Sequence, residues 1–158
     1  MHWPPLHDLL VIVAHLGLIG VGAWLLVIDA RTHRLPNRIV LPLGAALLVL
    51  MGIEAWATGD AWTLGRALVG MVILGGFYAL LNLAGGGVGG GDVKLAAVIG
   101  LVLAWHGWQA LAVGATTAFL LGAVYALLLM SLRRAHRSTR IAFGPWMIIG
   151  AALGIAVG

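Results

Sequence analysis

Long blocks of apolar residues constrain this chain more than any other feature of its sequence. Hydrophobic residues make up 62% of the 158 residues, whereas charged residues make up only 9%. The blocks are about 20 residues long, the length of a helix that crosses the hydrocarbon core of a bilayer. Backbone groups in lipid must pair internally, and the sequence shows no alternating β pattern, so the blocks predict helices. We therefore expect an all-α integral membrane protein.

We expect a bundle of about six transmembrane helices that forms a single membrane domain over residues 1–158. The expected spans are 9–28, 39–57, 64–83, 93–105, 110–132 and 141–157. The fourth span is short, which predicts a tilted or partly buried helix. Small residues in the third and fifth spans favour close helix packing. These residues are Gly70, Gly75, Gly76, Gly114, Ala118 and Gly122.

The lysine and arginine residues predict how the spans are oriented. Eight of the nine basic residues fall in connections on one side of the membrane, namely Arg31, Arg34, Arg38, Lys94, Arg133, Arg134, Arg137 and Arg140. Only Arg66 falls on the other side. Basic loops stay in the cytoplasm, so the first side is predicted to be cytoplasmic and both termini to lie outside. This topological pattern explains the positive charge without nucleic acid as a partner.

A glycine run that ends in an aspartate is the first candidate functional motif. Residues 85–92 read Gly-Gly-Gly-Val-Gly-Gly-Gly-Asp, and only five acidic side chains occur in the chain. A carboxylate at the end of an apolar span is costly, so Asp92 is a candidate functional residue. Glycine permits close approach of another chain, so Gly89 and Gly91 are candidates for holding an extended peptide. A hinge followed by a helix cap explains the run about equally well.

A second aspartate, Asp29, lies where the first apolar block stops. Arg31, Pro36 and Asn37 follow it in the connection to the second span. Pro36 disfavours helix at the residue before it, and Asn37 is a good cap for the next helix. Taken alone, the segment is better explained as a basic loop with a capped helix start. In the predicted topology, however, Asp29 and Asp92 both lie at the cytoplasmic face.

Two further features complete the set of candidates. Gly144 and Pro145 break or kink the chain at the entrance of the sixth span. Lys94 is either a topology marker or a side chain that orients a carboxylate or contacts the substrate backbone. The chain has no cysteine and no His-Glu-x-x-His signature, so we expect no metal and no cofactor.

Together these segments resemble the type IV prepilin leader peptidases, which are bacterial intramembrane aspartyl proteases of the Gly-x-Gly-Asp group. Members carry an aspartate followed by Leu/Ile-Pro-Asn, matched here by Asp29 and residues 35–37. They also carry Gly-x-Gly-Asp-x-Lys, matched by residues 89–94, and Phe-Gly-Pro, matched by residues 143–145. The motifs occur in the expected order over nearly the whole chain. The family usually has a proline where this chain has Ala142, a difference that affects loop shape and not the acids.

The resemblance implies an aspartyl endopeptidase of the bacterial cytoplasmic (inner) membrane whose active site faces the cytoplasm. Asp29 and Asp92 would be the catalytic pair. Its partner would be the helix of a type IV prepilin or pseudopilin precursor within the lipid bilayer, from which the enzyme removes a basic leader. Substrate-binding or supporting roles would fall to Gly89, Gly91, Lys94, Arg31, Pro36, Asn37, Gly144 and Pro145.

Two questions about activity follow from the resemblance. Larger family members carry an amino-terminal cytoplasmic insert with paired cysteines, which is associated with methylation of the new pilin amino terminus. This sequence resembles a short form lacking that insert, so we do not expect N-methyltransferase activity. The rival interpretation is a small proton- or cation-coupled transporter that uses Asp29 and Asp92. A transporter favours acids near midspan and broken helices in repeated halves, whereas both aspartates lie at span ends.

Overall fold

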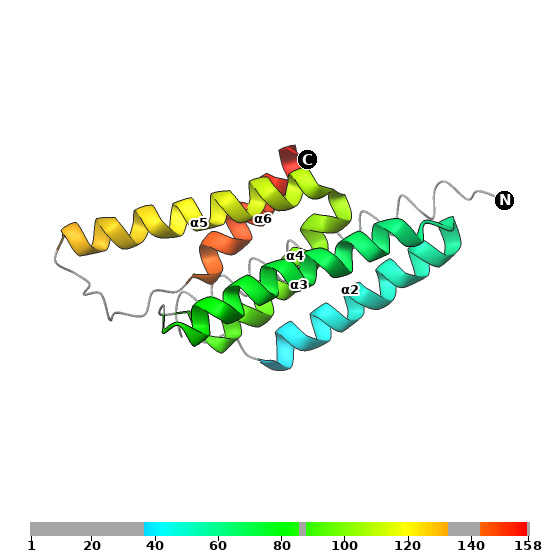
Figure 1. Cartoon of the computed structure of the whole chain (residues 1–158), viewed down its shortest axis with the longest axis horizontal. Helices are drawn as coiled ribbons and strands as arrows, with labels where there is room; N and C mark the ends of the chain where they lie inside the picture. Colours follow the sequence, from blue (N-terminus) through cyan, green and yellow to red (C-terminus); the bar gives the residue numbers. More distant parts are fainter. Residues whose placement is uncertain (1–36, 86–87, 133–142, 158) are drawn as a thin grey trace.

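The computed structural model describes residues 37–85, 88–132 and 143–157, and these residues form five α-helices (Figure 1). The helices are α2 (Asn37–Thr58), α3 (Ala61–Leu83), α4 (Gly90–His106), α5 (Trp108–Ser131) and α6 (Gly144–Val157). The prediction of an all-α fold is confirmed for this part of the chain.

Five of the six expected spans correspond to these helices, while the first, 9–28, lies outside the described residues. Six spans are therefore not confirmed. By length and composition, α2, α3 and α5 are long and apolar enough to cross a membrane. The other two are shorter, with 17 residues in α4 and 14 in α6. Buried residues run along most of α4, so the expectation of a short, partly buried fourth helix is confirmed.

Successive helices run in opposite directions, so α2, α4 and α6 begin at the same end of the bundle (Figure 1). The turn between α2 and α3 contains Gly59, whose φ of +73° is favourable for glycine. Asp60 then caps α3: its Oδ1 accepts from the Thr63 N–H at 3.1 Å and its Oδ2 from the Thr63 hydroxyl at 2.6 Å. Gly107, with φ +145°, makes the turn between α4 and α5.

Glycine lets α3 and α4 form the largest helix–helix contact among the described residues. A Cβ added at Gly70 would lie 2.6 Å from the carbonyl oxygen of Gly100, and one added at Gly75 would lie 2.9 Å from the Ala97 Cβ. The predicted packing role of small residues is thus confirmed for Gly70 and Gly75. It is wrong for Gly76, which faces open space because it lies on the exposed side of α3.

The pair formed by α5 and α6 is built in the same way. A Cβ added at Gly150 would lie 2.5 Å from the Gly114 carbonyl oxygen and 2.7 Å from the Ala118 Cβ. At Gly122 an added Cβ would lie 2.5 Å from the ring of Phe143. Lipid tails are as apolar as leucine, so close contacts of this kind, and not apolar burial, favour association of helices in a membrane.

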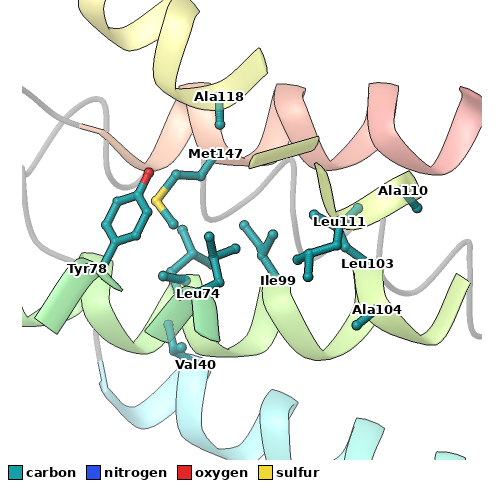
Figure 2. Packing of buried hydrophobic residues seen from close by; sticks show 12 residues of the cluster. Val40, Leu74, Tyr78, Ile99, Leu103, Ala104, Ala110, Leu111, Ala118 and Met147 are labelled. Atoms are coloured by element: carbon teal, nitrogen blue, oxygen red, sulfur yellow. The ribbon is translucent and has the colours of Figure 1, made fainter. Parts of the chain in front are cut away.

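One buried cluster joins the helices at the centre of the bundle (Figure 2). It includes Leu74 of α3, Ile99 and Leu103 of α4, Leu111 of α5 and Met147 of α6. Many large apolar side chains on the outside of α2, α3 and α5 are exposed instead. That distribution fits helices whose outer faces contact lipid.

Arg66 of α3 holds the last turn of α4. Its Nε donates to the Ala104 carbonyl at 2.6 Å and its Nη2 to the Trp105 carbonyl at 2.7 Å. Carbonyls in the last turn of a helix have no intrahelical partner, and a cation is favourable there. Arg66 therefore fixes the end of α4 that is remote from Asp92.

Candidate active site

Asp92 is buried in the first turn of α4, with 8% of its surface exposed. Its Oδ2 accepts a hydrogen bond from the Gly89 N–H at 2.8 Å, and its own N–H donates to the Gly89 carbonyl at 3.0 Å. The Asp92 carboxylate thus satisfies the N–H of the N-cap residue Gly89, which is the half of a capping box that a glycine N-cap allows. The sequence predicted that the helix begins at about residue 93, but it begins at Gly90 because Gly89 takes the cap position.

The glycines before Asp92 differ in what surrounds them. Gly89 has an extended conformation, with φ −84° and ψ 158°, which other residues also adopt. A Cβ added there would lie 3.4 Å from the Asp92 Oδ2, and one added at Gly90 would meet open space. Gly91 is half-buried in the first turn of α4. Backbone strain therefore does not require glycine at residue 89, but a side chain there would contact the Asp92 carboxylate.

Lys94 lies on the side of α4 that faces α2. It lines a groove of about 430 Å³ together with Val40 of α2 and Ala97 of α4. Val40 is 1% exposed and belongs to the same buried cluster as Leu95. The start of α2 therefore lies beside the start of α4, and the chain enters α2 at the end of the bundle that holds Asp92.

The Phe-Gly-Pro element forms the start of α6. The Phe143 carbonyl accepts from the N–H groups of Trp146 at 3.1 Å and Met147 at 3.2 Å. Gly144 is the buried first residue of the helix, and Pro145 follows it in the first turn, where the missing N–H of proline is tolerated. The prediction that Gly144 and Pro145 mark the entrance of the last helix is confirmed. Residues 141–142 of the expected span lie outside the described residues.

Tyr78 of α3 contacts the Phe-Gly-Pro element. It is 3% exposed, and its ring meets the Phe143 ring edge to face, with centroids 5.8 Å apart. Sequence reasoning missed Tyr78 because its contact with Phe143 depends on how α3 packs beside the start of α6. The available signal was a phenol group inside the apolar span 64–83.

The remaining candidates precede the described part of the chain or begin it. Asp29, Arg31 and Pro36 lie outside the described residues, so the meeting of Asp29 with Asp92 stays a prediction. Asn37 is the first residue of α2. Within residues 37–85, 88–132 and 143–157, no three His, Asp or Glu side chains are grouped so as to hold a metal ion.

The described site therefore offers one carboxylate held by a helix start, beside a run of glycines and a lysine. A single carboxylate can accept or donate a proton, whereas hydrolysis by aspartates uses two that share a proton. The chemistry depends on whether a second acid reaches this end of the bundle.

Comparison with known proteins gives the class to which this bundle and its buried aspartate belong. The sequence matches the type IV leader peptidase family over residues 16–127, and the chain belongs to that family. The resemblance inferred from the three motifs is thereby confirmed. No solved structure matches the chain.

Several curated relatives carry the name prepilin leader peptidase/N-methyltransferase. The chain is 37% identical over 143 residues to the one from Aeromonas salmonicida (strain A449), covering 85% of this chain and 47% of that protein. It is 33% identical over 150 residues to the Dickeya chrysanthemi protein, covering 94% and 52%. It is 35% identical over 133 residues to the Pseudomonas aeruginosa protein, covering 83% and 44%. The chain thus spans about half the length of these relatives.

Proposed function

We propose that this chain is an aspartyl endopeptidase that removes the basic leader from type IV prepilin-like or pseudopilin precursors. The observation that carries the proposal is Asp92, a buried carboxylate at the start of α4 directly after a glycine run, in a member of the type IV leader peptidase family. The relatives are named for a peptidase and an N-methyltransferase activity. We propose the peptidase activity alone for this chain.

Asp29 is the proposed second member of the catalytic pair. The connection that contains it leads into α2, whose first residue is Asn37. Val40 of α2 and Lys94 of α4 line the same groove, and this supports the assignment because the start of α2 then lies beside the start of α4. A segment that enters α2 there approaches the end of the bundle at which Asp92 lies.

The proposed mechanism uses the two aspartates as an acid and a base. Two close carboxylates in poorly hydrated surroundings do not readily both ionise, so they share one proton. The ionised partner takes a proton from water as the water oxygen attacks the scissile carbonyl carbon. The protonated partner donates to the carbonyl oxygen and later to the leaving amine. Such a pair titrates as a unit, so the proton belongs to both residues.

The proposed location is the bacterial cytoplasmic (inner) membrane, with the site at the cytoplasmic face. Lys94 lies at this end of the bundle, as a basic residue at the cytoplasmic side should. A substrate helix in the bilayer would present the junction between its basic leader and its apolar segment at the same depth. Anionic lipid headgroups attract both the leader and the basic loops of the enzyme.

The position of Asp92 supports a peptidase over the rival transporter. Coupling acids of transporters lie near the bilayer midplane, often at interruptions within a helix. Asp92 instead lies in the first turn of α4, beside the start of α2. A substrate that enters from the cytoplasmic side meets this end of the bundle first.

Cleavage of a prepilin-like substrate by purified variants tests the proposal. We expect Asp29→Asn and Asp92→Asn each to abolish release of the leader, because asparagine cannot serve as acid or base. Asp60→Asn is the matched control, since Asp60 caps the exposed start of α3 and asparagine is also a good N-cap. It should cleave at the wild-type rate. Retained cleavage in either of the first two variants would remove that aspartate from the catalytic pair.

A further inference from the structure

The long helices α3 and α5 are offset along their axes. They are almost equal in length, with 23 and 24 residues. Both run toward the end that holds Asp92, and the rings of Phe77 and Phe119 meet with centroids 6.4 Å apart, which fixes the register. From this contact α5 continues to Ser131, about 18 Å, whereas α3 continues only to Leu83, about 9 Å. The end of α5 accordingly projects beyond α3 in Figure 1.

The same offset recurs at the opposite end of the bundle. Counted back by equal steps from the ring contact, Trp108 at the start of α5 is level with Arg66 of α3. Arg66 bonds to the last turn of α4, which a tight turn joins to α5, so this register has independent support. α3 begins at Ala61, about 7 Å beyond that level. The two helices are therefore shifted past each other by roughly 8 Å.

The part of α5 that projects beyond α3 is apolar. Leu127, Leu128 and Leu132 are each more than half exposed. Arg133 and Arg134 follow in the sequence. Apolar side chains are unfavourable in water, and basic residues directly after an apolar span are typical of the membrane surface. Beside α5 the surface therefore lies near residue 132, and the projecting turns belong in the hydrocarbon.

Asp92 lies at a different level along the bundle. Gly75 of α3 lies against Ala97 of α4. The two helices run in opposite directions, so equal steps from this contact toward the same end lead to Leu80 and Asp92. Leu80 follows Phe77 by less than one helical turn. Asp92 is thus about 13 Å short of the level at which α5 ends.

The start of α2 shares the level of Asp92. A Cβ added at Gly44 of α2 would lie 3.0 Å from the Cγ2 of Val98 of α4. The two helices run in the same direction, and both begin about two turns before this contact. Arg38, in the first turn of α2, is exposed. Because a cation and the first N–H groups of a helix are costly in hydrocarbon, the membrane surface on this side lies near Asp92.

We propose that the bundle sits obliquely in the bilayer, so that the end of α5 and the starts of α2 and α4 reach one membrane surface. The lengths of the helices give the size of the tilt. α2, α3 and α5 are about 33–36 Å long and the hydrocarbon core is about 30 Å thick, so each fits when tilted by about 25–35°. The offset between α3 and α5 gives the direction of the tilt.

The opposite surface agrees with the same tilt. Trp62 lies on the part of α3 that projects beyond the start of α5, and it is 74% exposed. Trp108 is exposed at the start of α5 itself. Tryptophan side chains are favourable at the membrane–water interface. The two residues differ in level in the same sense as the two helix ends near Asp92, so both surfaces run obliquely and parallel to each other.

The oblique position gives each part of the Asp92 end a partner of defined chemistry. Lipid chains cover the projecting end of α5. Anionic headgroups are attracted to Arg38 and Lys94, which lie at the surface beside α2 and α4. If the chain is the proposed peptidase, this position also lets water reach Asp92, as hydrolysis requires. The tilt itself does not depend on the peptidase proposal.

Spin labels at single cysteines test the tilt, because the chain has no cysteine. Gly90→Cys labels the start of α4 and Leu128→Cys the projecting end of α5, and residue 128 lies about 6 Å farther along the bundle. Val72→Cys, exposed in the middle of α3, is the hydrocarbon reference. Accessibility to a water-soluble nickel chelate and to oxygen, which concentrates in hydrocarbon, is measured in vesicles of phosphatidylcholine and phosphatidylglycerol.

The oblique position predicts a reversed order of the two labels. We expect the nickel chelate to reach residue 90 more readily than residue 128, and residue 128 to resemble residue 72. In an upright bundle residue 128 lies nearer the water and is the more accessible of the two. Equal or higher nickel accessibility at residue 128 would therefore overturn the inference.

Hydrogen–deuterium exchange of the wild-type protein in the same vesicles tests the tilt without any substitution. We expect the amides of residues 126–131 to exchange as slowly as those in the middle of α3, because hydrocarbon excludes water from both. Rapid exchange at residues 126–131 would place the end of α5 in water and contradict the oblique position. Neither measurement uses cleavage, so a chain that cleaves no prepilin-like substrate refutes the peptidase proposal and leaves this inference to be decided by the labels and the exchange.

Discussion

Replacing Gly70 by alanine is the sharpest test of how α3 and α4 are held together. A Cβ at this position would lie 2.6 Å from the Gly100 carbonyl oxygen, whereas ordinary contact begins at about 3.4 Å. The carbonyl belongs to the backbone of α4, so it cannot turn aside as the end of a flexible side chain does. The added methyl group must therefore push the two helices apart.

The size of the effect follows from two opposing terms. Alanine is better than glycine within a helix by roughly 0.5–1 kcal/mol. Forcing an extra methyl group into a packed contact costs about 1–3 kcal/mol, and the contact here is between two backbones. Gly76→Ala is the matched control on the same helix, because its methyl group would meet open space. We expect the free energy of unfolding of Gly70→Ala to lie about 2 kcal/mol or more below that of Gly76→Ala.

Equilibrium unfolding in mixed micelles measures this difference. The chain has seven tryptophans, so fluorescence follows unfolding without a label. Gly76→Ala should unfold at the wild-type detergent fraction or slightly above it, and Gly70→Ala should unfold well below it. Equal unfolding midpoints for the two alanine variants would refute the close backbone contact between α3 and α4.

Two further predictions concern the ends of the helices. Arg66→Leu should lower the free energy of unfolding by about 1–3 kcal/mol, because the two carbonyls at the end of α4 lose their charged donor. The free energy of unfolding of Arg66→Lys should fall between those of Arg66→Leu and the wild type. Unchanged detergent midpoints for both variants would contradict the contact. The hydrogen bond from the Thr63 hydroxyl, and to a smaller extent the one from the Thr63 N–H, hold the pKa of Asp60 below its ordinary value of 3.8. A carboxyl group whose pKa is lower in the folded state stabilises the fold above its unfolded pKa, and this stability is lost as pH falls through the folded pKa. Melting temperatures below about pH 4 should therefore fall more steeply for the wild type than for Asp60→Asn, and identical slopes would count against the capping bonds.

Much of the helical architecture is predictable from the sequence, because lipid leaves the backbone few alternatives. The apolar blocks predict α2, α3 and α5 closely, and the shortness of the fourth block predicts the buried helix α4. The exact start of α4 is not predictable from hydropathy, since it depends on the local capping bonds of Asp92 with Gly89. Small residues mark helix contacts in general, but which side of a helix faces its neighbour is decided by packing, as the exposed Gly76 shows.

Residues of the candidate site that belong to a sequence motif are predictable from the sequence. Residues that only helix packing brings to the site are not. Asp92, Gly144 and Pro145 were recognised from their local sequence, and each lies at a helix start as expected. Tyr78 belongs to no motif, and its contact with Phe143 arises only when α3 packs beside the start of α6. The position of Asp29 depends on contacts between segments remote in sequence, which no local pattern determines.

A distance measurement between spin labels tests the central claim that Asp29 reaches the end of the bundle where Asp92 lies. The chain has no cysteine, so single cysteines can be placed beside the first aspartate at Ala30, at the exposed Gly90, and at the exposed Trp62 near the other end of α3. The ends of α3 are about 30 Å apart at the usual helical rise. The account predicts that the distance from residue 30 to residue 90 is much shorter than the distance from residue 30 to residue 62. The reverse order would place the two aspartates at opposite ends of the bundle and contradict a catalytic pair.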